Sequence, residues 1–137
     1  MTSRQQIVIP AEDWPAPLIT MNQMRGQSRY LAYKTRPWRH YARDLAKQLI
    51  AAGELEPVES ARVWMRVRHR DNRRRDTPNV MPVAKAIIDG LVDAGTFTDD
   101  CDGILEGPLL IRHYPNGPRQ IILDIESPLH IEEAPQS

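Results

Sequence analysis

The chain contains little cysteine, phenylalanine or long apolar sequence, and each shortage narrows what it can be. Cys101 is the single cysteine among 137 residues, so an intrachain disulfide and a cysteine-based zinc site are both excluded. One phenylalanine leaves the core to aliphatic side chains with a few Trp and Tyr. No apolar run approaches the roughly 18 residues of a membrane span, and the first residues have no hydrophobic signal core. We therefore expect a soluble, cytoplasmic protein with no membrane partner.

Two common catalytic patterns are also missing. The four histidines have no metal-ligand spacing such as His-Glu-x-x-His, and there is no nucleophilic-serine motif. The sequence thus predicts neither a histidine-based metalloenzyme nor a serine hydrolase.

The formal net charge is zero, which alone argues against a general polyanion binder. The charges are unevenly distributed, however. Residues 1–85 hold 16 Lys and Arg against 8 Asp and Glu, whereas residues 86–137 hold 2 against 10. A fold that keeps the two sets on different faces has a basic surface and an acidic pocket. Charges that intermix would instead form an ordinary solvated surface.

The length and the 41% hydrophobic content fit one domain. We place it at residues 1–126 and expect the acidic segment 127–137 to be a flexible tail. The predicted elements follow the order β-α-β-α-β-β. That order predicts an α+β fold in which two main helices pack on a small mixed β-sheet.

The first half of the chain predicts a strand, a loop and a helix. Residues 7–9 form a short apolar run closed by proline, and residues 10–35 indicate a long loop with basic residues. Thr35 can cap the first helix, with Pro37 in its first turn and Gly53 at its end. Its apolar residues recur at helical spacing and are interpreted as core.

Residues 60–69 alternate at a period of two and predict a strand. One face is apolar, and the other carries three arginines around Trp64. That combination suits phosphates and an unstacked base. The alternative is a wet outer face with a packed tryptophan.

The second half predicts one more helix and two more strands. The helix starts near Pro82 and ends by Gly95, with an apolar stripe for the core. Residues 107–114 and 119–126 are expected to be strands. Pro, Asn, Gly and Pro at residues 115–118 predict a hairpin turn between them.

Carboxylates lie on both sides of the second helix. The candidates for metal binding are Asp76, which precedes the helix, and Asp99, Asp100, Asp102 and Glu106, which follow it. Clustered carboxylates suit a hard divalent cation such as Mg²⁺, which assists phosphodiester hydrolysis. A helix of about 13 residues spans roughly 20 Å, so both ends can share a cation only if Gly95 reverses the chain. Asp89 and Asp93 are interpreted as helix-surface charge.

The segment from Arg73 to Asp100 resembles the RusA family of Holliday-junction resolvases, which are common in phages and prophages. The matching residues are Arg73-Arg74-Arg75-Asp76, Asn79, Lys85, Asp89-Gly90-Leu91, Ala94-Gly95 and Asp99-Asp100. The order of the remaining elements agrees over most of residues 7–126, although only the central segment is specific.

The resemblance implies a homodimer that binds four-way DNA junctions and nicks two strands symmetrically. The cofactor would be Mg²⁺, with Mn²⁺ as a substitute. The resemblance assigns metal binding to Asp76 and Asp100, with Asp99 as second choice. It assigns a catalytic role to Lys85, which would steady the phosphate. The location would be the cytoplasm of a bacterium or of a phage-infected host.

Branched DNA would be held through phosphate contacts. The residues expected to contact it are Arg25, Arg29, Lys34, Arg66, Arg68, Arg73, Arg74, Arg75 and Asn79.

The sequence departs from the family pattern at two places. Some members have a second Asp two positions after the first, where this chain has Pro78, which carries no ligand. The spacing from Asp76 to Lys85 is that of a longer-loop variant. Asp102, Asn79 or backbone oxygens can compensate for the missing carboxylate.

Two alternatives therefore stay open: a junction-binding protein that cuts poorly or not at all, and a small domain whose charges serve protein–protein contact.

Overall fold

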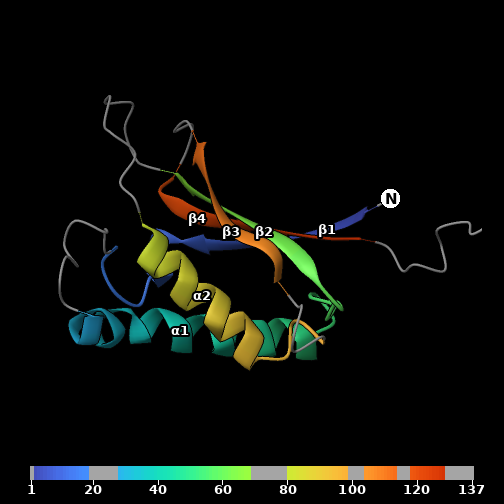
Figure 1. Ribbon diagram of the computed structural model, residues 1–137, viewed down its shortest axis with the longest axis horizontal. Coiled ribbons are helices and arrows are strands. Elements are labelled where there is room, and N and C mark those ends of the chain that lie inside the picture. Colours follow the sequence, from blue (N-terminus) through green and yellow to red (C-terminus); the bar gives the residue numbers. More distant parts are fainter. Residues whose placement is uncertain (1, 19–27, 69–79, 99–103, 114–117, 129–137) are drawn as a thin grey trace, which may run out of the picture.

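The fold is taken from a computed structural model that describes residues 2–18, 28–68, 80–98, 104–113 and 118–128. A four-stranded β-sheet forms one layer, and two helices form a second layer on one face of it (Figure 1). A short 3-10 helix, Ala11–Asp13, follows the first strand. The remaining elements have the predicted order β-α-β-α-β-β. The predicted α+β class with a small mixed sheet is therefore confirmed.

The strands are β1 (Thr2–Pro10), β2 (Ala61–Arg68), β3 (Ile104–His113) and β4 (Gln120–Pro128), and their order in the sheet is β1-β4-β2-β3. The last strand, β4, is antiparallel to both of its neighbours, β1 and β2, whereas β3 is parallel to β2. The sheet is mixed because three strands point one way and β4 points the other.

The first strand is longer than the predicted residues 7–9 because it pairs with β4 over its whole length. Ile7 and Ile9 are buried on the helix side, and the hydroxyls of Ser3 and Ser127 lie 2.7 Å apart. Pairing also carries β4 to Pro128, past the expected end of the domain at residue 126. Residues 129–137 of the expected tail lie outside the described residues.

The central strand β2 has the predicted alternation. Ala61, Val63, Met65 and Val67 are buried, and the residues between them are more exposed. The neighbouring strand β3 begins at Ile104, earlier than the predicted residue 107, because it continues pairing through an irregularity. Its register shifts between Arg62 and Trp64, opposite Gly107 and Pro108. An extra residue there is a β-bulge, a position that tolerates a proline within a strand.

The predicted hairpin between the last two strands is wrong. The strands β3 and β4 are not neighbours, because β2 lies between them and pairs with both. The turn residues 114–117 themselves lie outside the described residues. Asn-Gly is a local turn signal, but strand pairing depends on which apolar faces meet across the whole sheet.

The first helix, α1 (Ser28–Ala51), starts earlier than predicted. Thr35 is not its N-cap but a buried residue within it, and Pro37 lies in the helix interior instead of the first turn. The C-terminal part of the expected 10–35 loop is therefore helical, and residues 19–27 of that loop lie outside the described residues. Proline removes one helical hydrogen bond, but burial of Trp38 on the same helix stabilises the packed helix. The expected end before Gly53 is confirmed.

The second helix, α2 (Met81–Asp93), lies beside α1 under the sheet (Figure 1). Ile87 and Leu91 are buried against the sheet side of the core, as the apolar stripe predicts. No helix within the described ranges combines the length and the apolar character needed to cross a membrane.

The two helices are close together at Gly90. A Cβ at this position would lie 2.3 Å from the carbonyl oxygen of Arg39 and 2.8 Å from the Cβ of Ala42. Any side chain would therefore push the helices apart, so Gly90 of the Asp89-Gly90-Leu91 motif has a packing role.

The helix α2 ends by Gly95, as the sequence predicted, and a return of the chain along the helix toward Asp76 is not among the described features. Gly95 has φ +84°, the left-handed conformation, and its N–H donates to the carbonyl of Val92. The N–H of Thr96 donates to the carbonyl of Leu91, which completes a Schellman motif. The chain then turns away from the helix, and Phe97 pairs with Val58 just before β2.

Gly90→Ala tests the close approach. Alanine in an open helix is more stable than glycine by up to about 1 kcal/mol. Here we expect the opposite sign, a loss of about 1–3 kcal/mol in the free energy of unfolding from overpacking. Urea denaturation measures it, with the adjacent exposed Asp89→Ala as control, which we expect to change stability by no more than about 0.5 kcal/mol. An unchanged or raised stability of Gly90→Ala would contradict the packing role.

Candidate active site and nucleic-acid interface

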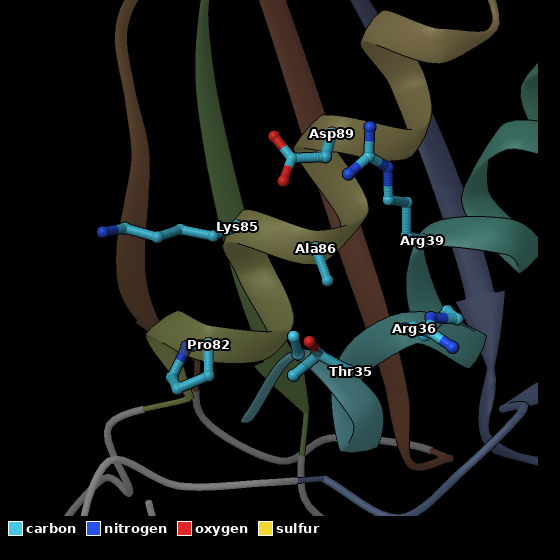
Figure 2. A pocket seen from close by; sticks show the side chains of 8 residues that line it. Thr35, Arg36, Arg39, Pro82, Lys85, Ala86 and Asp89 are labelled. Atoms are coloured by element: carbon cyan, nitrogen blue, oxygen red, sulfur yellow. The ribbon is translucent and has the colours of Figure 1, made fainter. Parts of the chain in front are cut away.

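A groove of about 350 Å³ runs between the N-terminal half of α2 and the facing part of α1. Its lining residues are Ala32, Thr35, Arg36 and Arg39 from α1, and Pro82, Lys85, Ala86 and Asp89 from α2 (Figure 2). Small or buried residues form its floor, and charged residues form its walls. Three cations and one carboxylate make the groove basic.

Lys85 is exposed on the second turn of α2. Its side chain extends away from α1, on the other side of α2 from Arg36 and Arg39 (Figure 2). No salt bridge joins it to a carboxylate of the described residues. A helix places this ammonium group at the surface, where it can meet an anionic ligand.

Asp89 lies one turn after Lys85, and Arg39 projects from α1 toward it (Figure 2). Arg39 also makes a bidentate pair with Asp93, with its Nε 2.7 Å and its Nη2 3.0 Å from the two carboxylate oxygens. These hydrogen bonds raise the pKa of Arg39 and lower the pKa of Asp93, and in both cases desolvation opposes the shift. Asp93 therefore joins the two helices, beyond the plain surface charge expected for it.

The groove cations Arg36 and Arg39 were missed because they fall inside a helix whose stripe was interpreted only as core. The available signal was the polar face of that helix, where arginines recur three or four residues apart.

The expected metal ligands Asp76, Asp99 and Asp100 lie outside the described residues, as do the alternatives Asp102 and Asn79. The backbone of Glu106 lies in β3, opposite Arg62. Among the described side chains, no three His, Cys, Asp or Glu residues gather as a metal site would require.

The topology fixes the route of the chain between β2 and β3. Because the two strands are parallel, α2 returns the chain from the end of β2 to its start, where Ile104 pairs beside Ala61. The segments 69–79 and 99–103, which carry these carboxylates, lie outside the described residues. Convergence of Asp76 with Asp99 or Asp100 on one cation stays a prediction.

The arginine face of β2 is occupied by counter-charges that the sequence interpretation did not weigh. Arg66 pairs with the buried Asp124 at 2.8 Å, and Arg62 lies 3.8 Å from Glu126, which also binds Arg4. This geometry favours the alternative interpretation of this face, as an outer face of the sheet with a packed tryptophan, over a phosphate-binding surface. The acidic residues come from β4, whose alternating polar positions were the only hint.

Three polar atoms on this face are buried without a hydrogen-bond partner among the described residues: Trp64 Nε1, Arg66 Nε and Arg68 Nε. Both arginines thus keep part of their donor capacity, although Nη2 of Arg66 is held by Asp124.

The other expected DNA contacts divide into two groups. Arg29 and Lys34 belong to α1 instead of a loop, and Lys34 is exposed. Arg25 and the run Arg73–Arg75 lie outside the described residues.

The Arg39–Asp93 pair predicts a pH-dependent stability. The pKa of Asp93 is lowered in the folded state, so the pair stabilises the fold above the unfolded pKa of about 4 and loses this effect as pH falls through the folded value. Asp93→Asn should cost up to about 1 kcal/mol near neutral pH, since both side chains are partly solvated. The difference should disappear at strongly acidic pH.

Urea denaturation of wild type and Asp93→Asn at several pH values measures this effect. Asp44→Asn, the same change at a carboxylate that pairs only with its neighbour Arg43, is the matched control, and we expect a smaller effect. An equal loss for Asp93→Asn at acidic and neutral pH would contradict the assignment.

Comparison with known proteins supplies no relative for this chain: no protein-family model matches it, and no match was found among curated proteins. The chemistry of the site must therefore be argued from its own residues.

Proposed function

We propose that this protein is a metal-dependent endonuclease that resolves four-way DNA junctions by paired phosphodiester hydrolysis. The observation that carries the proposal is the basic groove with Lys85 on its wall. The helix that bears Lys85 directly follows the segment Arg73–Asp76, and Arg36 and Arg39 face it from α1. Arg36 and Arg39 from α1 and Lys85 from α2 thus border the groove, and Lys85 follows the proposed ligand Asp76 by nine residues in the chain.

Phosphodiester hydrolysis requires that water attack phosphorus, that the bond to the leaving oxygen break, and that the leaving oxygen take up a proton. The exposed ammonium of Lys85 can hold a non-bridging phosphate oxygen and stabilise the negative charge that grows there. Arg36 is suited to a phosphate of the same strand, because guanidinium binds phosphate oxygens in a fork.

Asp76 and Asp100, with Asp99 as second choice, would hold Mg²⁺ or Mn²⁺. The ion would supply a nucleophilic hydroxide and charge neutralisation. Pro78 removes one carboxylate that some members of the RusA family have, so Asp102 or Asn79 would complete the ligand set.

The resemblance to the RusA family, which the sequence motif carries, also supports the proposal, and the fold agrees with the expected α+β class. The element order is the expected one, and Gly90 and Gly95 of the shared motif each have a structural reason. A homodimer with a twofold axis would present two such sites to a junction whose strands are related by the same symmetry.

A nicking assay on a synthetic four-way junction with Mg²⁺ or Mn²⁺ tests the proposal. We expect Asp76→Asn and Asp100→Asn to abolish detectable cutting while junction binding persists. Lys85→Gln should reduce the cutting rate about 10²–10³-fold, the effect of removing one electrostatic stabiliser of the transition state.

Two matched controls accompany these variants. Asp44→Asn removes an exposed carboxylate on α1, and Arg4→Gln removes an exposed cation on β1, far from the groove. Both should cut like wild type. Tight junction binding with no product under any metal condition would reject the nuclease and favour a non-catalytic junction-binding protein.

A further inference from the structure

The helix α1 is strongly basic although the chain is neutral. Between Ser28 and Ala51 the sequence has six Lys and Arg residues and one acidic residue, Asp44. A helix at the surface of a neutral protein ordinarily mixes both signs, since opposite charges three or four residues apart stabilise it. The composition of α1 therefore calls for an explanation other than helix stability.

Four basic residues of α1 lie on one face. Arg36, His40, Arg43 and Lys47 follow one another at spacings of four, three and four residues, which places them in a row along the helix; we call this row the basic stripe. Trp38, Ala42 and Ala46, on the opposite face, are buried in the core. The basic stripe consequently lies on the side of α1 opposite to its buried face.

The stripe is only partly neutralised: Asp93, which pairs with Arg39, also interacts electrostatically with Arg43 and His40. Arg43 pairs at 2.9 Å with Asp44, whose side chain is itself 60% exposed. No salt bridge joins Arg36 or Lys47 to a carboxylate of the described residues. Arg43 and Lys47 are like charges four residues apart, an arrangement that costs roughly 0.2–0.5 kcal/mol. On the outer face of the sheet, by contrast, Asp124 and Glu126 neutralise the arginines.

The chemistry of the stripe favours a nucleic-acid backbone over a membrane surface. A helix that inserts into a membrane interface needs an exposed apolar face, but the apolar face of α1 is already buried against the sheet. The stripe also continues into the basic groove, because Arg36 belongs to both. The stripe and the groove arginines of α1 thus adjoin, whereas the side chain of Lys85 extends from the other side of α2.

We propose that the basic stripe holds the phosphate backbone of a duplex arm of the DNA, at a distance from the strand that Lys85 would contact. From Arg36 to Lys47 the helix rises about 17 Å. At 3.4 Å of axis per phosphate on one strand, this length faces about five phosphates. The choice of DNA as the ligand rests on the proposed function. The role assigned to α1 is binding, not catalysis.

The test compares Arg43→Gln/Lys47→Gln, two stripe residues that do not line the groove, with Arg4→Gln/Arg119→Gln, a control that removes the same charge from residues of or next to the sheet. Binding of a four-way junction is measured by fluorescence anisotropy between about 50 and 300 mM salt, in Ca²⁺ to prevent cutting. We expect the stripe variant to bind on the order of 10-fold more weakly, with a salt slope lower by about 1–2, whereas the control keeps the wild-type slope.

A second measurement separates binding from chemistry. At saturating protein, the stripe variant should nick the junction at the wild-type rate. Its binding defect should be larger on long-armed than on short-armed junctions. Circular dichroism and urea denaturation establish that both double variants are folded.

The outcomes are distinguishable. If wild type binds the junction and both double variants bind with the same affinity and slope, the basic stripe is not a DNA contact, whatever happens to the nuclease. If wild type binds the junction but never cuts it, the proposed nuclease function is rejected. The comparison of the two double variants then still tests whether the basic stripe contacts DNA. If wild type binds no DNA, or if the stripe variant loses only its binding to phosphatidylserine vesicles, the stripe proposal is overturned.

Discussion

The close approach of α1 and α2 at Gly90 is the constraint on which the rest of the helix layer depends. Because no side chain separates the backbones there, the two helices share one buried stripe against the sheet. The same contact sets the width of the groove farther along, where small residues such as Ala32 and Ala86 leave room between the charged walls. The Arg39–Asp93 pair then joins the helices just past the contact.

Charge is arranged differently on the two layers. The outer face of the sheet carries the arginines of β2, but β4 places Asp124 and Glu126 among them, beside Arg66 and Arg62. The helix layer has most of its cations on α1 and Lys85 on α2, and the described residues place Asp44, Asp89 and Asp93 near the cations of α1. A neutral chain can therefore present one surface with an excess of positive charge, and it is the helix layer that presents it.

The proposed nuclease and the proposed duplex contact draw on different parts of this layer. Lys85 and its neighbours belong to the groove, where a strand could be held for chemistry, and the basic stripe lies on the outer side of α1. Arg36 connects them. A junction-cutting enzyme needs both functions, since it must orient long duplex arms as well as bind the scissile phosphate.

Much of the architecture was predictable because it follows from local periodicity. The alternation of Ala61 to Val67 predicted a half-buried strand, and the stripe around Trp38 and that around Ile87 predicted two core helices. Gly95 was predicted to end the second helix, because glycine adopts a positive φ without steric cost, and it does so. These features depend on residues a few positions apart.

The sequence by itself thus determined the elements, their order and the candidate chemistry. Only the tertiary structure decided that β2 separates β3 from β4, that α1 extends back to Ser28 through Pro37, and that Asp124 neutralises Arg66. The physical reason is the same in each case: partners distant in the chain compete with local preferences, and burial of a shared apolar face decides which of them wins.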